Sequence, residues 1–210
     1  MAAINKELLL LEKLKVWDII DLDPPYKLVG TTWVFKKKKN NLNKVIEHKA
    51  CLYTQGFTQT AGINFDKTYS PTGRLNSLRT FIAFAASNAP SFHQINVKSA
   101  FLNAPLSETV YLSLPQGLKG DKRKSCLHLN KAIYGLKQAP LAWYKRLKHW
   151  LLDVGFKACI LDPCVFHQKG KDSLWLYVHV DNIAFLGKRL NASRPRLPMS
   201  LKSRILAWLM

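Results

Sequence analysis

Residues 174–187 read LWLYVHVDNIAFLG, with two runs of Val, Tyr, Phe and Ile on either side of the polar pair Asp181-Asn182. This pattern predicts two buried strands joined by a tight turn at that pair. A carboxylate at the tip of a packed hairpin is held rigidly and reaches solvent, as metal-assisted chemistry on phosphates requires. Asp and Asn are also common in turns for purely local reasons, so the hairpin alone leaves both interpretations open.

The composition points to a globular protein with a polyanionic partner. The chain has 210 residues, of which 48% are apolar, so it can bury a hydrophobic core. Its 32 Lys and Arg against 13 Asp and Glu give a formal net charge of +19, which favours nucleic acid over an anionic membrane surface. We find no long apolar run and no secretory leader, so we expect an intracellular protein without a membrane span.

The four cysteines are scattered along the chain, which is typical of reduced thiols. Cys159, Cys164 and His167 are close enough in sequence to consider a zinc site. No Cys-x-x-Cys pair accompanies them, and the segment has the composition of a strand. Buried thiols are therefore the favoured interpretation.

Periodicity and turn residues predict the remaining elements. Helices are expected at 4–15, 76–88 and 139–154, the last with Pro140 in its first turn and Gly155 after its end. Strands at 31–39 and 44–54 form a long hairpin, whose lysines line either a solvated edge or a phosphate track. Shorter strands are expected at 93–97, 111–114, 126–129 and 164–167, and the basic segment after Gly187 has the character of a loosely packed or disordered tail.

Five segments in order carry a resemblance to a known family: TTWVFKKKK with EHKACL, QGFTQTAGINFDKTYSPTGRLNSLRT, QINVKSAFLNAPLSETVYLSLPQG, AIYGLKQAPLAWYKRL and LYVHVDN. Over residues 17–187 the sequence resembles the reverse transcriptase domain of copia-type (Ty/copia) LTR retrotransposons. The resemblance implies an α+β, right-hand polymerase fold of fingers and palm, with an antiparallel palm sheet backed by helices. Residues 1–16 are then an N-terminal helical lead-in, residues 188–210 a divergent basic tail outside the fold, and the thumb is missing.

The resemblance also implies roles for individual residues. The three metal-binding aspartates of the family fall on Asn96, Asp181 and Asn182, so Asp181 is the one expected metal ligand. Phe101 matches the bulky residue that lies under the sugar and rejects a 2′-hydroxyl. The other expected nucleotide-binding residues lie in the fingers hairpin and in a Tyr-Gly segment: Lys36, Lys38, Tyr134, Gly135, Lys137 and Gln138.

The implied cofactor is a pair of Mg²⁺ ions. The implied partners are an RNA or DNA template-primer, deoxynucleoside triphosphates and the remaining Pol domains, RNase H and integrase, in a cytoplasmic virus-like particle or the nucleus. An amide offers Mg²⁺ a neutral oxygen where a carboxylate offers a charged one, so metal binding should weaken badly at Asn96 and Asn182. We therefore expect a reverse transcriptase by descent that has lost its chemistry, the alternative being a non-catalytic nucleic-acid-binding remnant.

Two further positions depart from the family pattern, since Cys51 and Leu141 stand where it has Arg. An exchange of Asp for Asn needs one G-to-A transition, and an exchange of Arg for Cys can need one C-to-T transition. These departures favour the hypothesis of a decayed element copy.

Overall fold

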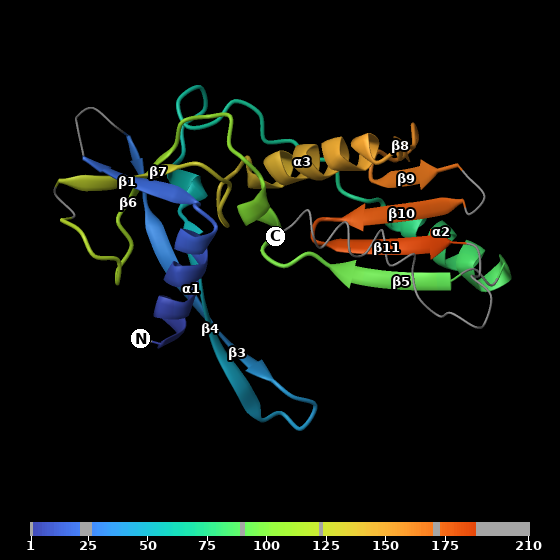
Figure 1. Ribbon diagram of the computed structural model, residues 1–210, viewed down its shortest axis with the longest axis horizontal. Coiled ribbons are helices and arrows are strands. Elements are labelled where there is room, and N and C mark those ends of the chain that lie inside the picture. The colour runs from blue at the N-terminus through green and yellow to red at the C-terminus, as the bar shows by residue number, and fades with distance from the viewer. Residues whose placement is uncertain (1, 22–26, 89–90, 122–123, 170–172, 188–210) are drawn as a thin grey trace. The chain divides into compact units, whose positions relative to one another are not determined.

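The computed structural model of this protein describes residues 2–21, 27–88, 91–121, 124–169 and 173–187 (Figure 1). The chain divides into two compact units. Unit 1 comprises Met1–Tyr69 and Phe101–Trp143, and unit 2 comprises Ser70–Ala100 and Tyr144–Met210. Helices and sheets occur together in the described residues, so the predicted α+β class is confirmed.

Unit 1 contains a four-stranded sheet in the order β1-β7-β6-β2. Its strands are β1 (Trp17–Asp21), β2 (Leu28–Val29), β6 (Tyr111–Ser113) and β7 (Ser125–Leu129). β7 is antiparallel to both β1 and β6, whereas β2 runs parallel to β6. The two 3-10 helices in the described residues are η1 (Gly56–Thr58) and η2 (Ala100–Asn103). Alternate apolar residues such as Leu112 and Leu127 are fully buried and form the core.

Unit 1 also contains helix α1 (Ala2–Lys13) and a two-stranded hairpin of β3 (Thr31–Lys39) and β4 (Val45–Thr54). The connection is closed by Asn40, whose Oδ1 accepts hydrogen bonds from the N–H groups of Leu42 at 3.0 Å and Lys44 at 2.9 Å. α1 lies beside β4, and Lys6 Nζ donates to Glu47 Oε1 at 2.7 Å. The predicted basic hairpin is confirmed.

Unit 2 is built on a five-stranded antiparallel sheet in the order β5-β11-β10-β9-β8. Its strands are β5 (Ser91–Asn96), β8 (Lys157–Ala158), β9 (Val165–Gln168), β10 (Leu174–His179) and β11 (Asn182–Gly187). Helix α2 (Leu75–Asn88) lies behind this sheet in Figure 1. Phe81 and Leu78 of the helix pack with Tyr177 and Ala184 of the sheet. This packing is the helical stripe of residues 76–88 that the sequence predicts.

Helix α3 (Ala139–Asp153) begins in unit 1 and continues into unit 2. Gly155 follows its end with a φ of 93°, a left-handed conformation that glycine adopts without strain. The N–H of Gly155 donates to Leu152 O at 2.9 Å, and the N–H of Phe156 donates to Leu151 O at 2.9 Å. These bonds satisfy carbonyls that the helix end leaves free, as the sequence predicts.

The hairpin of β10 and β11 turns one residue earlier than the sequence indicates. His179 pairs with Asn182, so Val180 and Asp181 occupy the turn and Asn182 is the first residue of β11. Val180 has a φ of 55°, which a two-residue hairpin loop requires at its first position but which strains a β-branched residue. The expected turn at Asp181-Asn182 is therefore wrong by one position, because Val180 accepts the left-handed conformation that Asn favours.

Two expectations from the sequence concern the basic tail and membrane spans. Residues 188–210 lie outside the described residues. Within the described part of the chain, no helix is long and apolar enough to span a membrane.

Candidate functional site

The three predicted catalytic residues meet at one end of the sheet of unit 2. Antiparallel pairing of β5 with β11 places Asn96 directly opposite Asn182. The N–H of Val97 donates to Asp181 O at 2.7 Å, which holds the turn against the end of β5. Ile183 and Phe185 are buried one and three residues further along β11 and anchor the strand in the core.

Side-chain hydrogen bonds link these residues to one another. Asn96 Nδ2 donates to Asp181 Oδ2 at 2.8 Å and to Asn182 Oδ1 at 3.3 Å. Asn182 Nδ2 donates to Asp181 Oδ1 at 3.2 Å. Gln94 Nε2 donates to Asn182 Oδ1 at 3.2 Å. Both oxygens of the single carboxylate therefore accept bonds from amides.

This donor set does not fit a pair of divalent cations. Mg²⁺ prefers oxygen ligands that include carboxylates, but Asp181 supplies the one carboxylate among these residues. Asn96 and Asn182 turn N–H donors toward it, and a donor presents hydrogen rather than a lone pair to a cation. Across the described residues, no three His, Cys, Asp or Glu side chains form a group that could hold a metal ion.

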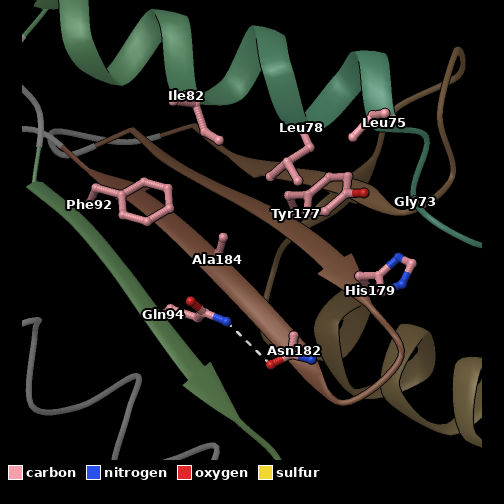
Figure 2. Close-up of a pocket in the computed structure, with 10 residues that line it drawn as sticks. All are labelled: Gly73, Leu75, Leu78, Ile82, Phe92, Gln94, Tyr177, His179, Asn182 and Ala184. Atoms are coloured by element: carbon pink, nitrogen blue, oxygen red, sulfur yellow. Dashed lines mark hydrogen bonds between the residues drawn. The ribbon is translucent and has the colours of Figure 1, made fainter.

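An open pocket of about 590 Å³ lies beside this network, between α2 and the sheet. Figure 2 shows Leu75, Leu78 and Ile82 of α2 above the strands, with Tyr177 and Ala184 on the sheet below. Its remaining lining residues are Gly73, Phe92, Gln94, His179 and Asn182. Asn182 and Gln94 thus belong both to the hydrogen-bond network and to the polar end of the pocket.

Sequence reasoning missed Asp162, which fastens the start of α2 within unit 2. Asp162 is only 3% exposed, and it accepts bonds from the N–H groups of Cys164 at 2.9 Å and Arg74 at 3.1 Å. Burial raises the pKa of Asp162, but hydrogen bonds from Ser77, Cys164 and Arg74, with the Arg74 charge, hold it below the usual value. The Asp162-Pro163 pair is the turn signal that marks such a residue in the sequence.

Burial, with the negative charge of Asp162, raises the pKa of Cys164 to about 12. The thiol is therefore protonated at neutral pH, as is typical of a buried cysteine in apolar surroundings. This agrees with the favoured interpretation of Cys164 as a buried thiol.

Unit 1 holds the residues predicted to bind nucleotide. The Tyr134 ring lies 5.3 Å from the Phe101 ring and 5.5 Å from the Tyr53 ring, between ring centroids. Tyr134 O accepts the N–H of Thr54 at 2.8 Å, which fixes this segment to the end of β4. Gly135 follows with a φ of 94°, and a Cβ there would lie 2.2 Å from Thr54 O. The close approach therefore requires glycine.

Lys137 and Gln138, the other two predicted residues of this segment, have different environments. Gln138 is 2% exposed, and its amide donates to Asn64 O at 2.8 Å and accepts from Gln59 Nε2 at 3.0 Å. Lys137 is exposed, its N–H donates to Gln59 Oε1 at 2.9 Å, and its Nζ lies 4.8 Å from the centroid of the Phe65 ring. Gln138 supports the segment from inside, whereas the side chain of Lys137 lies at the surface and its Nζ donates to Gln59 O at 3.3 Å.

Lys36 and Lys38 lie on one face of the β3-β4 hairpin. Register pairs them with Lys49 and Glu47, and alternation places Tyr53 of β4 on the same face. Tyr53 contacts Tyr134, so this face leads from the exposed lysines to the aromatic group. We call it the Lys36 face.

Comparison with known proteins identifies the family. Residues 14–195 match the family described as reverse transcriptase (RNA-dependent DNA polymerase). The chain belongs to this family. The resemblance to copia-type reverse transcriptases is thereby confirmed.

Three curated relatives are similar to this reverse transcriptase domain. One is the retrovirus-related Pol polyprotein from transposon TNT 1-94 of Nicotiana tabacum, 34% identical over 192 residues, which are 90% of this chain and 14% of the relative. The others are the retrovirus-related Pol polyproteins from transposons RE2 and RE1 of Arabidopsis thaliana, 37% and 36% identical over 174 residues. Those alignments cover 81% of this chain and 12% of each relative. The chain thus spans a small part of the length of its relatives.

Proposed function

We propose that this chain supplies the fingers and palm of a copia-type reverse transcriptase, which bind template-primer but no longer support metal-dependent nucleotide addition. Unit 1, with its basic hairpin, corresponds to the fingers. Unit 2, with its antiparallel sheet and covering helix, corresponds to the palm. The family match and the order of the elements along the chain support this assignment.

The 2.8 Å bond from Asn96 Nδ2 to Asp181 Oδ2 carries the proposal. In two-metal phosphoryl transfer, the ions are held by carboxylates and stabilise both the attacking and the leaving oxygen. Here an amide donor binds the carboxylate that a cation would need, and two of the three positions add no negative charge. If the ions lower the barrier by several kcal/mol, their loss slows the reaction on the order of a thousandfold or more.

The predicted nucleotide-binding residues retain the chemistry for that task. Phe101 and Tyr134 present neighbouring rings, and Lys36 and Lys38 present exposed ammonium groups on the Lys36 face. We propose that these four side chains and Lys137 contact the nucleotide. Gly135 and Gln138 then act by holding the Tyr134 segment in place.

Primer extension on a homopolymer template with Mg²⁺ tests the loss of chemistry. The unmodified chain should extend no primer. The double variant Asn96→Asp with Asn182→Asp should recover activity in part at most, because Cys51 and Leu141 also depart from the family. Asn76→Asp, which adds a charge elsewhere in unit 2, serves as the control and should stay inactive. Robust synthesis by the unmodified chain would overturn the proposal.

The nucleic-acid binding in this proposal is supported by the net charge of +19 and the exposed lysines of β3. Several phosphate contacts predict a steep fall in template-primer affinity as salt is added. A salt titration measures this directly. An affinity that does not change with salt would rule out the electrostatic contribution.

A further inference from the structure

A tight loop of unit 1 begins at Thr60 and ends at Phe65. Thr60 O accepts the N–H of Asn64 at 2.9 Å, and the N–H of Thr60 donates to Asn64 Oδ1 at 3.0 Å. The N–H of Gly62 donates to Phe65 O at 2.9 Å. Asn64 is 3% exposed, and its backbone oxygen accepts a bond from Gln138 Nε2 at 2.8 Å. These bonds fix Phe65 beside the segment that carries Gln138.

The Phe65 ring contacts the side chain of Lys137. Lys137 Nζ lies over this ring at 4.8 Å from its centroid, and it also donates to Gln59 O at 3.3 Å. A cation is attracted to the electron-rich face of an aromatic ring when it lies within about 6 Å of the centroid. The long and flexible side chain of Lys137 is therefore held by two groups of neighbouring residues before any ligand binds.

Neither of the two groups that hold the Lys137 ammonium carries a charge. Among the described residues, no carboxylate forms an ion pair with Lys137. A carboxylate would hold the ammonium but would also neutralise it, whereas a ring face and a carbonyl oxygen hold it and leave its positive charge for an anion. An ammonium has three N–H donors, so the contacts with Gln59 and Phe65 leave at least one donor for a phosphate oxygen.

We propose that Phe65 is a positioning residue, which holds the Lys137 ammonium where it meets the phosphates of the bound nucleotide. The inference rests on the proposed function, because it assumes that Lys137 contacts the nucleotide. It goes further by assigning a role to a residue that acts through Lys137. A side chain that is already held loses less rotamer freedom when the ligand binds, so the nucleotide should bind more tightly.

Titration of the full chain with a fluorescent dATP analogue, in the presence of template-primer, tests the proposal. Phe65→Leu keeps the apolar bulk but removes the ring face, and it should weaken binding of the analogue about fivefold. Phe65→Tyr keeps the ring face and should bind as the unmodified chain does. Both variants should bind template-primer with unchanged affinity, and a loss of template-primer affinity by Phe65→Leu without a loss for the nucleotide would overturn the inference.

A double-mutant cycle separates positioning from a purely structural role. Lys137→Gln should weaken binding of the dATP analogue on the order of tenfold, because it removes a charged hydrogen-bond donor. Phe65→Leu should then have no further effect, since the ring acts through the ammonium. Phe57→Leu is the matched control, because Phe57 is 81% exposed in η1 and within the described residues its ring contacts no cation. This variant should bind the analogue as the unmodified chain does.

The outcomes distinguish this inference from the proposed function. Equal affinities of Phe65→Leu and Phe57→Leu, with normal binding by the unmodified chain, would overturn the inference and leave the proposed function intact. A fivefold loss that persists in the Lys137→Gln background would also overturn the inference, because the ring would then act on the fold and not on the ammonium. No binding of the dATP analogue by the unmodified chain would overturn the nucleotide contacts of the proposed function itself.

Discussion

Side-chain amides form a hydrogen-bond network in each unit, around Gln59 and Gln138 in unit 1 and around Asn96 and Asn182 in unit 2. The two networks differ in burial. Gln59 and Gln138 are 5% and 2% exposed, whereas Asn96 is exposed. A lost bond is expensive in the first network because water cannot replace it, but water can replace the bonds of the exposed Asn96 in the second. The first network therefore holds the Tyr134 segment in place. The hydrogen bonds of the second network join its own side chains and stabilise little else.

The comparison explains how the hairpin can keep its geometry with amides at two of the three predicted metal-binding positions. The hairpin that carries Asp181 is anchored by Ile183 and Phe185 in the core, and not by the side chains of the turn. Exchanging an exposed carboxylate for an amide of the same shape leaves this packing unchanged. In unit 1, residue type and structure are coupled more tightly, because Gly135 and Gln138 have no room for alternatives.

The largest effect should come from Gly135→Ala. Its backbone is left-handed, and the new Cβ would lie 2.2 Å from Thr54 O, so strain and overpacking together should cost about 3 kcal/mol of unfolding free energy. Gly62→Ala is the matched control, since Gly62 has a φ of 76° but nothing within 4 Å of the added Cβ. It should cost about 1 kcal/mol by denaturant unfolding. Equal losses would show that the contact with Thr54 is not required.

Gln59→Ala should have the next largest effect. The variant leaves the Lys137 N–H and the buried Gln138 Oε1 without their hydrogen-bond partner. This loss should lower the free energy of unfolding by about 2 kcal/mol. Gln116→Ala, at an exposed glutamine of the same unit, should change the denaturation midpoint little. If the two variants are equally stable, the buried network does not hold the segment.

A smaller effect is expected when charge is returned to unit 2. In a chelating buffer, Asn96→Asp with Asn182→Asp places like charges beside Asp181 and should cost about 1 kcal/mol. Adding Mg²⁺ should restore the melting temperature of this variant, because ligand binding stabilises the folded state. The unmodified chain should melt at the same temperature with and without Mg²⁺. A loss that Mg²⁺ does not restore would contradict this account of the site.

The smallest effect concerns Glu7 of α1. Burial raises the pKa of Glu7 above its usual 4.5, although the Lys49 charge and the Leu52 N–H partly oppose the change. The folded state therefore favours the protonated form, and stability should fall as the pH rises from 4.5 through the pKa of the folded state. Glu7→Gln should be slightly more stable than the unmodified chain at pH 7 and equally stable near pH 4. Glu12→Gln, on the exposed side of α1, should match the unmodified chain at both pH values in thermal melts.

Local patterns in the sequence predict most of the fold. The apolar stripe of 76–88, the Pro140 to Gly155 helix and the basic hairpin all formed, because neighbours along the chain determine them. β1 and β2 were not predicted, since β2 has two residues and both strands depend on partners about a hundred residues away in β7 and β6. The turn shifted because Val180 adopts a conformation that its residue type disfavours.

The candidate site was predicted through family resemblance more than through residue type. Nothing local brings Phe101 near Tyr134, or Asn96 opposite Asn182, because each contact joins segments that are distant in sequence. Gln138 illustrates the limit, since its sequence neighbours do not indicate that its amide is buried. The roles of these residues in nucleotide binding stay predictions.

Binding of Mn²⁺, followed by electron paramagnetic resonance on the full chain, tests most directly whether the hairpin has lost its metal site. Mn²⁺ prefers carboxylate and carbonyl oxygens, as Mg²⁺ does. The unmodified chain should bind no more Mn²⁺ than an Asp181→Ala control, and the double variant Asn96→Asp with Asn182→Asp should gain a site. Tight Mn²⁺ binding by the unmodified chain that Asp181→Ala abolishes would contradict the account.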